Sequence, residues 1–323
     1  MTEEKTFRDL VNTFFETHGK PEHQQAAYDA LEGGEALYPE YASLINSWRF
    51  CAAGLLNKPD LAIGIMKEGL DAGYWWHKEF LKTDEDLKSL QELPEFNRIV
   101  EIADKRYQEA MAAAKAVALP LRLPTPSKEG FSLLLPLHGN NGNAKKSVGF
   151  WESAVDEGWM TVLLQSSEIF FDADSFVWND MEKAGKEIKV QVEEFKAVYS
   201  INGERTVMGG FSKGAEMAVW FTLMEILPMR GFIAVNPGGP YIQDITLWEP
   251  ILENCERLSE MRGVFVAGEH DPSVEQIREL HGLLVSKGMD CQLVIAPEID
   301  HEFPENFGEI LAEGLKFIGK NDS

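Results

Sequence analysis

Cysteine is scarce in this chain. Only three of the 323 residues are cysteines: Cys51, Cys255 and Cys291. An odd number, at spacings unlike those of metal sites, predicts reduced, partly buried thiols, with neither a disulfide framework nor a metal centre. The chain also lacks a Gly-x-Gly-x-x-Gly segment and a Walker loop, so we expect no bound cofactor.

Basic side chains are also few. Thirty Lys and Arg face 53 Asp and Glu, which gives a formal net charge of −23 at pH 7. This excess disfavours nucleic acids and anionic membrane surfaces as partners. No apolar run reaches the length of a membrane span, and the residues after Met1 lack the apolar core of a secretory signal. We therefore expect a cytoplasmic protein.

The first 119 residues contain almost no strand-like alternation, and their apolar spacing predicts a series of helices, several beginning at a proline. The stretch from Gly73 to Phe96 holds an aromatic pair, Trp75-Trp76, a Thr-Asp-Glu-Asp-Leu turn and a Pro-Glu-Phe helix start. It resembles the closing segment of bacterial tetratricopeptide-type modules. The resemblance implies a helical-repeat domain that either recruits a protein partner or covers the functional site of the following domain. We expect the two tryptophans to seal the helical stack rather than to bind a ligand.

Three prolines between Pro120 and Pro126 separate this helical part from the rest of the chain. We place the boundary so that a helical domain spans residues 1–118 and a second domain spans 119–323. From residue 130 onward, short apolar strands alternate with helical stretches. This alternation predicts an α/β domain with a mainly parallel sheet, helices on both faces and ligands at the carboxyl ends of the strands.

One segment of the second domain indicates a nucleophile. A short apolar strand runs into Gly210-Phe211-Ser212-Lys213-Gly214, and a helical pattern follows at once. A serine at the tip of a sharp strand-to-helix turn projects its hydroxyl group clear of the sheet, and the glycines leave room for the tight backbone. The alternative interpretation of Ser212 is a helix N-cap after a glycine-rich turn.

A serine nucleophile needs a histidine base and an orienting acid at neighbouring strand ends. Of the seven histidines, only His301 lies in a loop between a predicted strand and the final helix. Asp271 follows another buried strand and completes the chain order Ser, Asp, His. Glu269 is the competing acid, whereas Asp300 is too close in sequence to face the ring of His301.

The oxyanion formed during such a reaction needs two N–H donors. We predict the backbone of Lys213 as one donor and the backbone of Asn140 as the other, with Gly139 as the flanking candidate. His138 precedes this turn, and we expect its ring to support the loop by hydrogen bonding.

Two loops that follow strands, 166–180 and 237–241, are expected to select the substrate. Their aromatic residues Phe171, Trp178 and Tyr241 are candidates for an apolar acyl or alcohol pocket, although aromatics in long loops also hold the loop in place. The chain has no insertion of the size of a lipase lid. Together with the acidic composition, this favours small soluble esters over lipid interfaces.

Four segments carry a further resemblance: Leu137–Gly139, Gly209–Ala215, Gly268–Asp271 and His301–Pro304. With them, the chain from about residue 118 to 320 resembles the α/β-hydrolase superfamily, in its carboxylesterase, phospholipase and dienelactone-hydrolase-like branch. The resemblance implies a Ser-His-Asp hydrolase with an acyl-serine intermediate. Two positions depart from the family pattern: Lys213, where relatives often carry Gln or His, and residues 297–300, which replace a glycine-rich approach to the histidine.

Three functions remain open from the sequence. A serine carboxylesterase is favoured, and a peptidase with the same triad is its neighbour among enzymes. The third is a non-catalytic binding protein that uses the helical module, with the hydrolase-like domain as a scaffold. The intact residues Ser212, Asp271 and His301 count against this third function.

Overall fold

The computed structural model describes residues 7–125, 127–128 and 130–320. The chain divides into two compact units. The first comprises the residues up to Ala114 together with Ile169–Ser175, and the second comprises Lys115–Glu168 and the residues from Phe176 onward. The helical unit therefore ends four residues before the boundary placed from the sequence, and it takes in a segment from much later in the chain.

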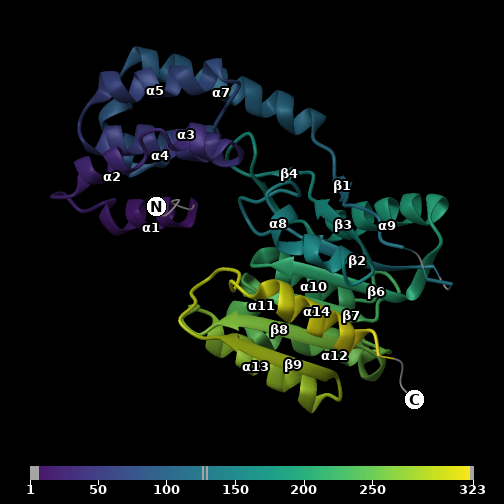
Figure 1. The fold of residues 1–323 in the computed structure, drawn as a ribbon. Helices are drawn as coiled ribbons and strands as arrows, with labels where there is room; N and C mark the ends of the chain where they lie inside the picture. Colours follow the sequence, from purple (N-terminus) through teal and green to yellow (C-terminus); the bar gives the residue numbers. More distant parts are fainter. Residues whose placement is uncertain (1–6, 126, 129, 321–323) are drawn as a thin grey trace. The chain divides into compact units, whose positions relative to one another are not determined.

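Over its described residues, the helical unit consists of α-helices and two 3₁₀ turns (Figure 1). Proline occupies a first-turn position of both α5 (Pro59–Asp71) and α7 (Pro94–Ala113), where a missing N–H leaves no helical bond unmade. The elements are α1 (Phe7–Thr17), α2 (Gln24–Ala30), α3 (Gly34–Leu37), η1 (Pro39–Tyr41), α4 (Ala42–Leu55), α5 (Pro59–Asp71), α6 (Lys78–Thr83), η2 (Glu85–Leu90) and α7 (Pro94–Ala113).

The aromatic pair of this unit belongs to its core. Trp76 is fully buried and Trp75 is 6% exposed. The ring of Trp76 meets that of Phe50 edge to face at 4.9 Å between centroids. It also packs so closely on α5 that a Cβ at Gly69 would lie 2.8 Å from it. These contacts give the two tryptophans a packing role.

The segment Ile169–Ser175 completes the helical unit. The N–H of His77 donates to the carbonyl oxygen of Phe171 at 2.7 Å, and Trp76 forms a β-bridge with Asp172. The ring of Phe171 lies edge to face against Phe80, with 5.4 Å between centroids. A loop that leaves one unit thus contributes backbone pairing and an aromatic ring to the other.

The second unit is built on a seven-stranded sheet in the order β1-β3-β2-β6-β7-β8-β9 (Figure 1). Only β1 runs antiparallel to its neighbour in this order, and the pairings among the other strands are parallel. The strands are β1 (Val117–Pro120), β2 (Phe131–Leu137), β3 (Trp159–Gln165), β6 (Ile201–Phe211), β7 (Gly231–Val235), β8 (Arg262–Gly268) and β9 (Asp290–Ala296), while β4 (Glu168–Ile169) and β5 (Phe176–Val177) form a separate pair. The predicted fold class is confirmed.

Helices cover both faces of this sheet. Three leucines of β2 face the core on one side of the sheet, which is shared with α9 (Met181–Val198), α10 (Lys213–Leu223) and α13 (Val274–Ser286); they are Leu133, Leu135 and Leu137. Leu134 faces the core on the other side, which is shared with α8 (Val148–Trp151) and α14 (Phe307–Ile318). Burial on both faces explains why β2 is a continuous apolar run rather than an alternating one. The helical elements are α8 (Val148–Trp151), η3 (Glu152–Val155), α9 (Met181–Val198), α10 (Lys213–Leu223), α11 (Pro240–Gln243), η4 (Ile245–Trp248), α12 (Glu249–Asn254), η5 (Leu258–Glu260), α13 (Val274–Ser286) and α14 (Phe307–Ile318).

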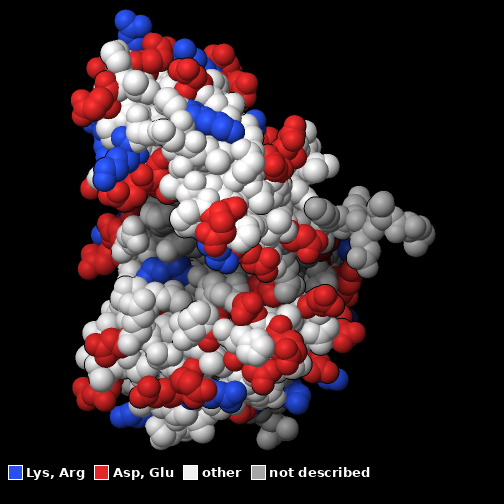
Figure 2. Space-filling model, turned by 90° about the vertical axis from the view of Figure 1, so that its left-hand side faces the viewer, with Lys and Arg blue, Asp and Glu red and all other residues white. Residues whose placement is uncertain are grey.

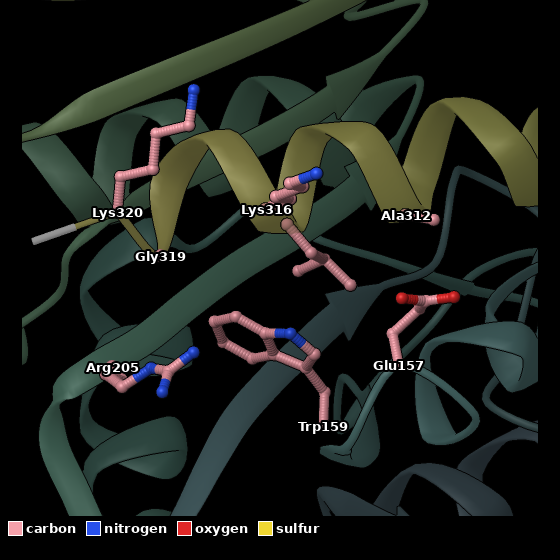
Figure 3. A pocket seen from close by; sticks show the side chains of 8 residues that line it. Glu157, Trp159, Arg205, Ala312, Lys316, Gly319 and Lys320 are labelled. Atoms are coloured by element: carbon pink, nitrogen blue, oxygen red, sulfur yellow. The ribbon is translucent and has the colours of Figure 1, made fainter.

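A pocket of about 350 Å³ lies where β3 begins and α14 ends. The guanidinium group of Arg205 lies 5.7 Å from the ring centroid of Trp159, and Glu157 and Lys316 flank the two (Figure 3). Ligands of parallel α/β sheets bind at the opposite, carboxyl ends of the strands, so this pocket is separate from the site described below.

Acidic side chains are spread over the face drawn in Figure 2, with Lys and Arg scattered among them. None of the helices in the described residues has both the length and the apolar character of a membrane span.

Candidate active site

Ser212 stands between β6 and α10 in a strained backbone conformation. Its φ is 53° and its ψ is −122°, a region that residues other than glycine rarely adopt. The flanking glycines make the turn possible. A Cβ at position 210 would lie 2.2 Å from the carbonyl oxygen of Gly214, and one at position 214 would lie 2.4 Å from that of His138. The strand, turn and helix therefore project the serine hydroxyl from the carboxyl end of a central strand.

Ser212, His301 and Asp271 form one hydrogen-bonded chain. The hydroxyl group of Ser212 lies 2.8 Å from Nε2 of His301, and Nδ1 of the same ring lies 2.6 Å from Oδ2 of Asp271. Asp271 is 2% exposed, and its other oxygen accepts the N–H of Ser273 at 2.7 Å. The histidine follows β9 and the acid follows β8, so three strand ends meet at one point. The structure thus brings together all three residues predicted for the triad.

The competing acid Glu269 has a different role. Its side chain is exposed, and its carboxylate accepts the N–H of Glu298 at 3.2 Å. Glu298 has a φ of 56°, a conformation for which glycine is the usual choice. This hydrogen bond to Glu269 holds Glu298, which lies in the segment 297–300 that precedes His301.

Asn236 is a site residue that the sequence analysis missed. It is fully buried after β7 with a φ of 43°. Its Nδ2 donates to the carbonyl oxygen of Glu302 at 2.6 Å, and its Oδ1 accepts the N–H of Gly268 at 2.7 Å. Asn236 therefore ties the end of β8 to the loop of His301. The only sequence signal was an Asn at the end of a buried strand, and this does not reveal its partners.

The predicted oxyanion loop, which holds Gly139 and Asn140, lies against Ser212. A Cβ at Gly139 would lie 3.2 Å from that of Ser212, and the loop closes with a hydrogen bond from the N–H of Gly142 to the carbonyl oxygen of Gly139. Asn140 is exposed in this turn. Lys213 is the first residue of α10, so its N–H has no helical carbonyl to reach. Both predicted donors therefore belong to backbone segments beside Ser212.

His138 supports this loop from inside the protein. It is 1% exposed, its Nδ1 lies 2.8 Å from the carbonyl oxygen of Gly139, and its Nε2 lies 3.3 Å from the N of Ser166. These partners require a neutral ring that donates from Nδ1 and accepts at Nε2. Burial lowers the pKa of His138 to about 4, so the neutral form persists at pH 7.

The three aromatic residues predicted for the substrate pocket have different surroundings. Trp178 is 1% exposed and donates from Nε1 to the carbonyl oxygen of His138 at 2.9 Å, which makes it a support of the oxyanion loop. Phe171 packs within the helical unit. Tyr241 remains partly exposed, with its ring edge to face against Trp248 at 5.1 Å between centroids. Its role in substrate binding stays a prediction.

Within the part of the chain that the structure describes, two groups of side chains have potential metal-ligand atoms within 4.8 Å of one another. One joins buried Cys51 to Asp84 and Asp86 in the helical unit. Its Asp84 carboxylate already accepts the N–H of Asp86 at 2.8 Å as a helix cap. The other group consists of exposed side chains beside the Asp271 turn, namely Glu269, His270 and Glu298. Neither group includes Ser212, His301 or Asp271.

Comparisons with known proteins agree with this architecture. Residues 6–111 match the family described as "A/B hydrolase-like, N-terminal domain". An uncharacterized protein from Bacillus cereus ATCC 10987 shares 25% identity and a TM-score of 0.53, over 98% of this chain and 100% of its own. The structure of esterase PE8, at 18% identity and a TM-score of 0.51, is similar in fold over 63% of this chain and 99% of its own. No curated protein matches the sequence.

Proposed function

Because the chain is a member of the α/β-hydrolase superfamily with an N-terminal helical domain, we propose that it is a serine hydrolase, and specifically a carboxylesterase. The observation that carries the proposal is the unbroken hydrogen-bonded chain from Ser212 through His301 to buried Asp271. A serine hydroxyl group that donates to an imidazole oriented by a carboxylate is the arrangement that acyl transfer requires.

In the proposed reaction, Oγ of Ser212 attacks the ester carbonyl carbon while Nε2 of His301 takes the hydroxyl proton. Asp271 stabilises the resulting imidazolium through Nδ1–H. The N–H groups of Lys213 and Asn140 would stabilise the oxyanion. The tetrahedral intermediate then collapses, and the proton on Nε2 passes to the departing alkoxide, which leaves as an alcohol. Water, activated by the same ring, attacks the acyl-serine and releases the carboxylic acid.

We further propose that the substrates are small soluble esters and that the protein is cytoplasmic. A net charge of −23 repels anionic lipid surfaces, and the sequence has no insertion of the size of a lipase lid. The described residues hold the three cysteines as free thiols, as expected in a reducing compartment.

The test is intact-mass detection of a fluorophosphonate adduct on the wild type and on Ser212→Ala, alongside hydrolysis of p-nitrophenyl esters of increasing acyl length. A single adduct that disappears in the variant, together with turnover of the shorter esters, is the expected result. A folded wild type that neither forms the adduct nor hydrolyses any ester would refute the proposed function.

A further inference from the structure

A buried ion pair lies directly behind the nucleophile. Lys213 and Glu216 are one turn apart on α10, and their side chains are 9% and 0% exposed. Their ammonium and carboxylate groups are in direct contact. Burying two charges carries a desolvation penalty that their mutual attraction offsets only when further hydrogen bonds satisfy the remaining atoms. The other hydrogen-bond partners of Lys213 and Glu216 therefore indicate the role of the ion pair.

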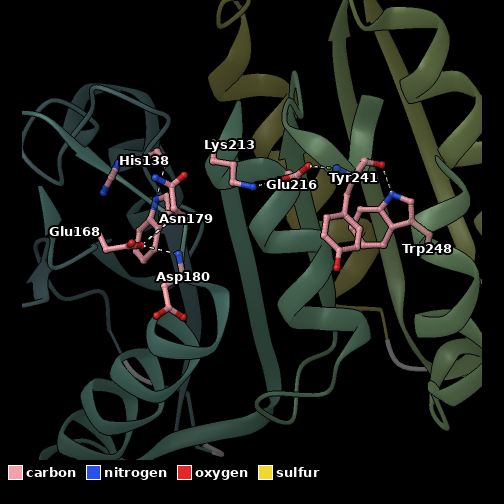
Figure 4. Close-up of polar contacts among 9 residues, drawn as sticks. His138, Glu168, Asn179, Asp180, Lys213, Glu216, Tyr241 and Trp248 are labelled. Carbon is pink, nitrogen blue, oxygen red and sulfur yellow. Dashed lines mark hydrogen bonds and ion pairs between the residues drawn. The ribbon is translucent and has the colours of Figure 1, made fainter. Parts of the chain in front are cut away.

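The carboxylate of Glu216 reaches past Lys213 to another loop. Its Oε1 accepts the N–H of Tyr241 at 2.6 Å, and Trp248 in turn donates from Nε1 to the carbonyl oxygen of Tyr241 at 2.7 Å (Figure 4). Burial raises the pKa of Glu216, while Lys213 and the N–H groups of Tyr241 and Ile242 act in the opposite direction. The carboxylate thus joins α10 to the start of α11.

The backbone of this loop fits closely around the carboxylate. Gly239 has a φ of 144°, which only glycine adopts readily, and a Cβ there would lie 2.4 Å from Oε2 of Glu216. The neighbouring residue faces the reaction centre. The N–H of Gly238 donates to the carbonyl oxygen of Ser212 at 3.1 Å. A Cβ at position 238 would lie 3.7 Å from Oγ of Ser212 and 3.6 Å from Cε1 of His301.

We propose that Glu216, charge-neutralised by Lys213, is a positioning residue that holds the segment Pro237–Tyr241 as the substrate-facing wall beside Ser212 and His301. The assignment of this wall to substrate rests on the proposed function. None of the contacts of Glu216 described above involves a triad side chain, so it acts through the segment. Its loss should alter which esters fit rather than the reactivity of the serine.

The experiment compares Glu216→Gln with Glu216→Met in the full-length protein. Both variants remove the charge and keep a similar volume, but only Gln retains an oxygen that accepts the N–H of Tyr241. Hydrogen exchange of peptides covering 237–243 is followed by mass spectrometry. In Glu216→Met we expect exchange about tenfold faster at Tyr241 and Ile242, and in Glu216→Gln exchange close to that of the wild type.

Kinetics provide the second readout. For Glu216→Met, the ratio of kcat/KM for p-nitrophenyl hexanoate to that for the acetate should change at least about fivefold, mainly through KM. The rate of labelling by a small fluorophosphonate should stay within about threefold, because the triad is untouched. Gly239→Ala, which displaces the same segment without removing a charge, should shift the ester ratio in the same direction. Glu182→Ala, at an exposed position on α9, is the control.

Equal exchange in the Gln and Met variants would overturn the proposal, and so would an unchanged ester ratio in folded Gly239→Ala. Failure of the proposed function looks different. In that case the wild type would form no adduct and hydrolyse no ester, while the exchange comparison would still decide whether Glu216 holds the segment.

Discussion

Ser212, the proposed nucleophile, has a strained backbone conformation. A non-glycine residue at a φ of 53° stores about 1–3 kcal/mol of strain, which the packing of β6 and α10 maintains. Ser212→Ala should reduce ester turnover at least about 10⁴-fold and leave the free energy of unfolding near that of the wild type. Ser212→Gly should be equally inactive and more stable than Ser212→Ala by about 1 kcal/mol, because glycine relieves the strain.

Urea unfolding of the two variants checks this expectation. If Ser212→Gly is no more stable than Ser212→Ala, the turn is not strained in solution. If either variant retains ester turnover, Ser212 is not the nucleophile.

His138 should make the protein sensitive to acid. The folded-state pKa of about 4 lies below the ordinary value of 6.5, so the folded protein binds this proton less readily than the unfolded chain. The folded protein keeps its full stability above about pH 6.5 and loses stability as the pH falls towards 4. At pH 4 the loss from this group amounts to about 3 kcal/mol. In His138→Asn, the free energy of unfolding should fall less steeply between pH 6.5 and 4. Parallel pH profiles of wild type and variant would rule out this role.

The turn between β6 and α10 depends on glycines for close packing between elements. A Cβ at Gly214 would meet the carbonyl oxygens of His138 and Leu137 at 2.4 and 2.5 Å, and these belong to the end of β2 and the oxyanion loop. Gly214→Ala should destabilise the fold by about 3 kcal/mol or more, since backbone atoms cannot move aside as a flexible side chain can. Gly149→Ala, where nothing lies within 4 Å of the new Cβ, should be neutral or slightly stabilising.

Thermal unfolding of the two glycine variants tests whether alanine destabilises the protein only where the backbone is closely packed, or at both glycine positions. A Gly214→Ala protein as stable as Gly149→Ala would show that the turn is looser than described.

The site residues differ in how far their roles could be predicted from the sequence. Gly210, Ser212 and Gly214 act within five residues of one another, so the chain order itself carries their geometry. Asn236 and Glu216 act on loops distant in sequence, through hydrogen bonds to backbone atoms of Glu302 and Tyr241. A side chain that forms a hydrogen bond to a backbone group does not restrict the residue type of its partner. Such contacts leave no pattern in a single sequence, and so these two residues were not predicted.

At the scale of the whole molecule, the same limit applies to the loop 166–180. Its aromatic residues follow a strand, which is why the sequence predicts a substrate pocket there. Packing separates them instead: Trp178 is buried beneath the oxyanion loop, while Phe171 belongs to the helical unit with Phe80. The helical unit is therefore not simply the amino-terminal part of the chain, because a segment of the hydrolase sequence completes it.

Phe171 and its neighbour Phe170 provide the matched test. Phe171→Ala removes a ring packed against Phe80 and should destabilise the helical unit by about 1–3 kcal/mol, with faster proteolysis within 169–175. Phe170→Ala, at a residue 39% exposed, should have a smaller effect on both. Ester kinetics separate the two interpretations of Phe171. If the ring lined the substrate pocket, Phe171→Ala would raise KM and leave stability unchanged. If the ring completes the helical unit, the variant loses stability but hydrolyses even the esters with the longest acyl chains as efficiently as the wild type.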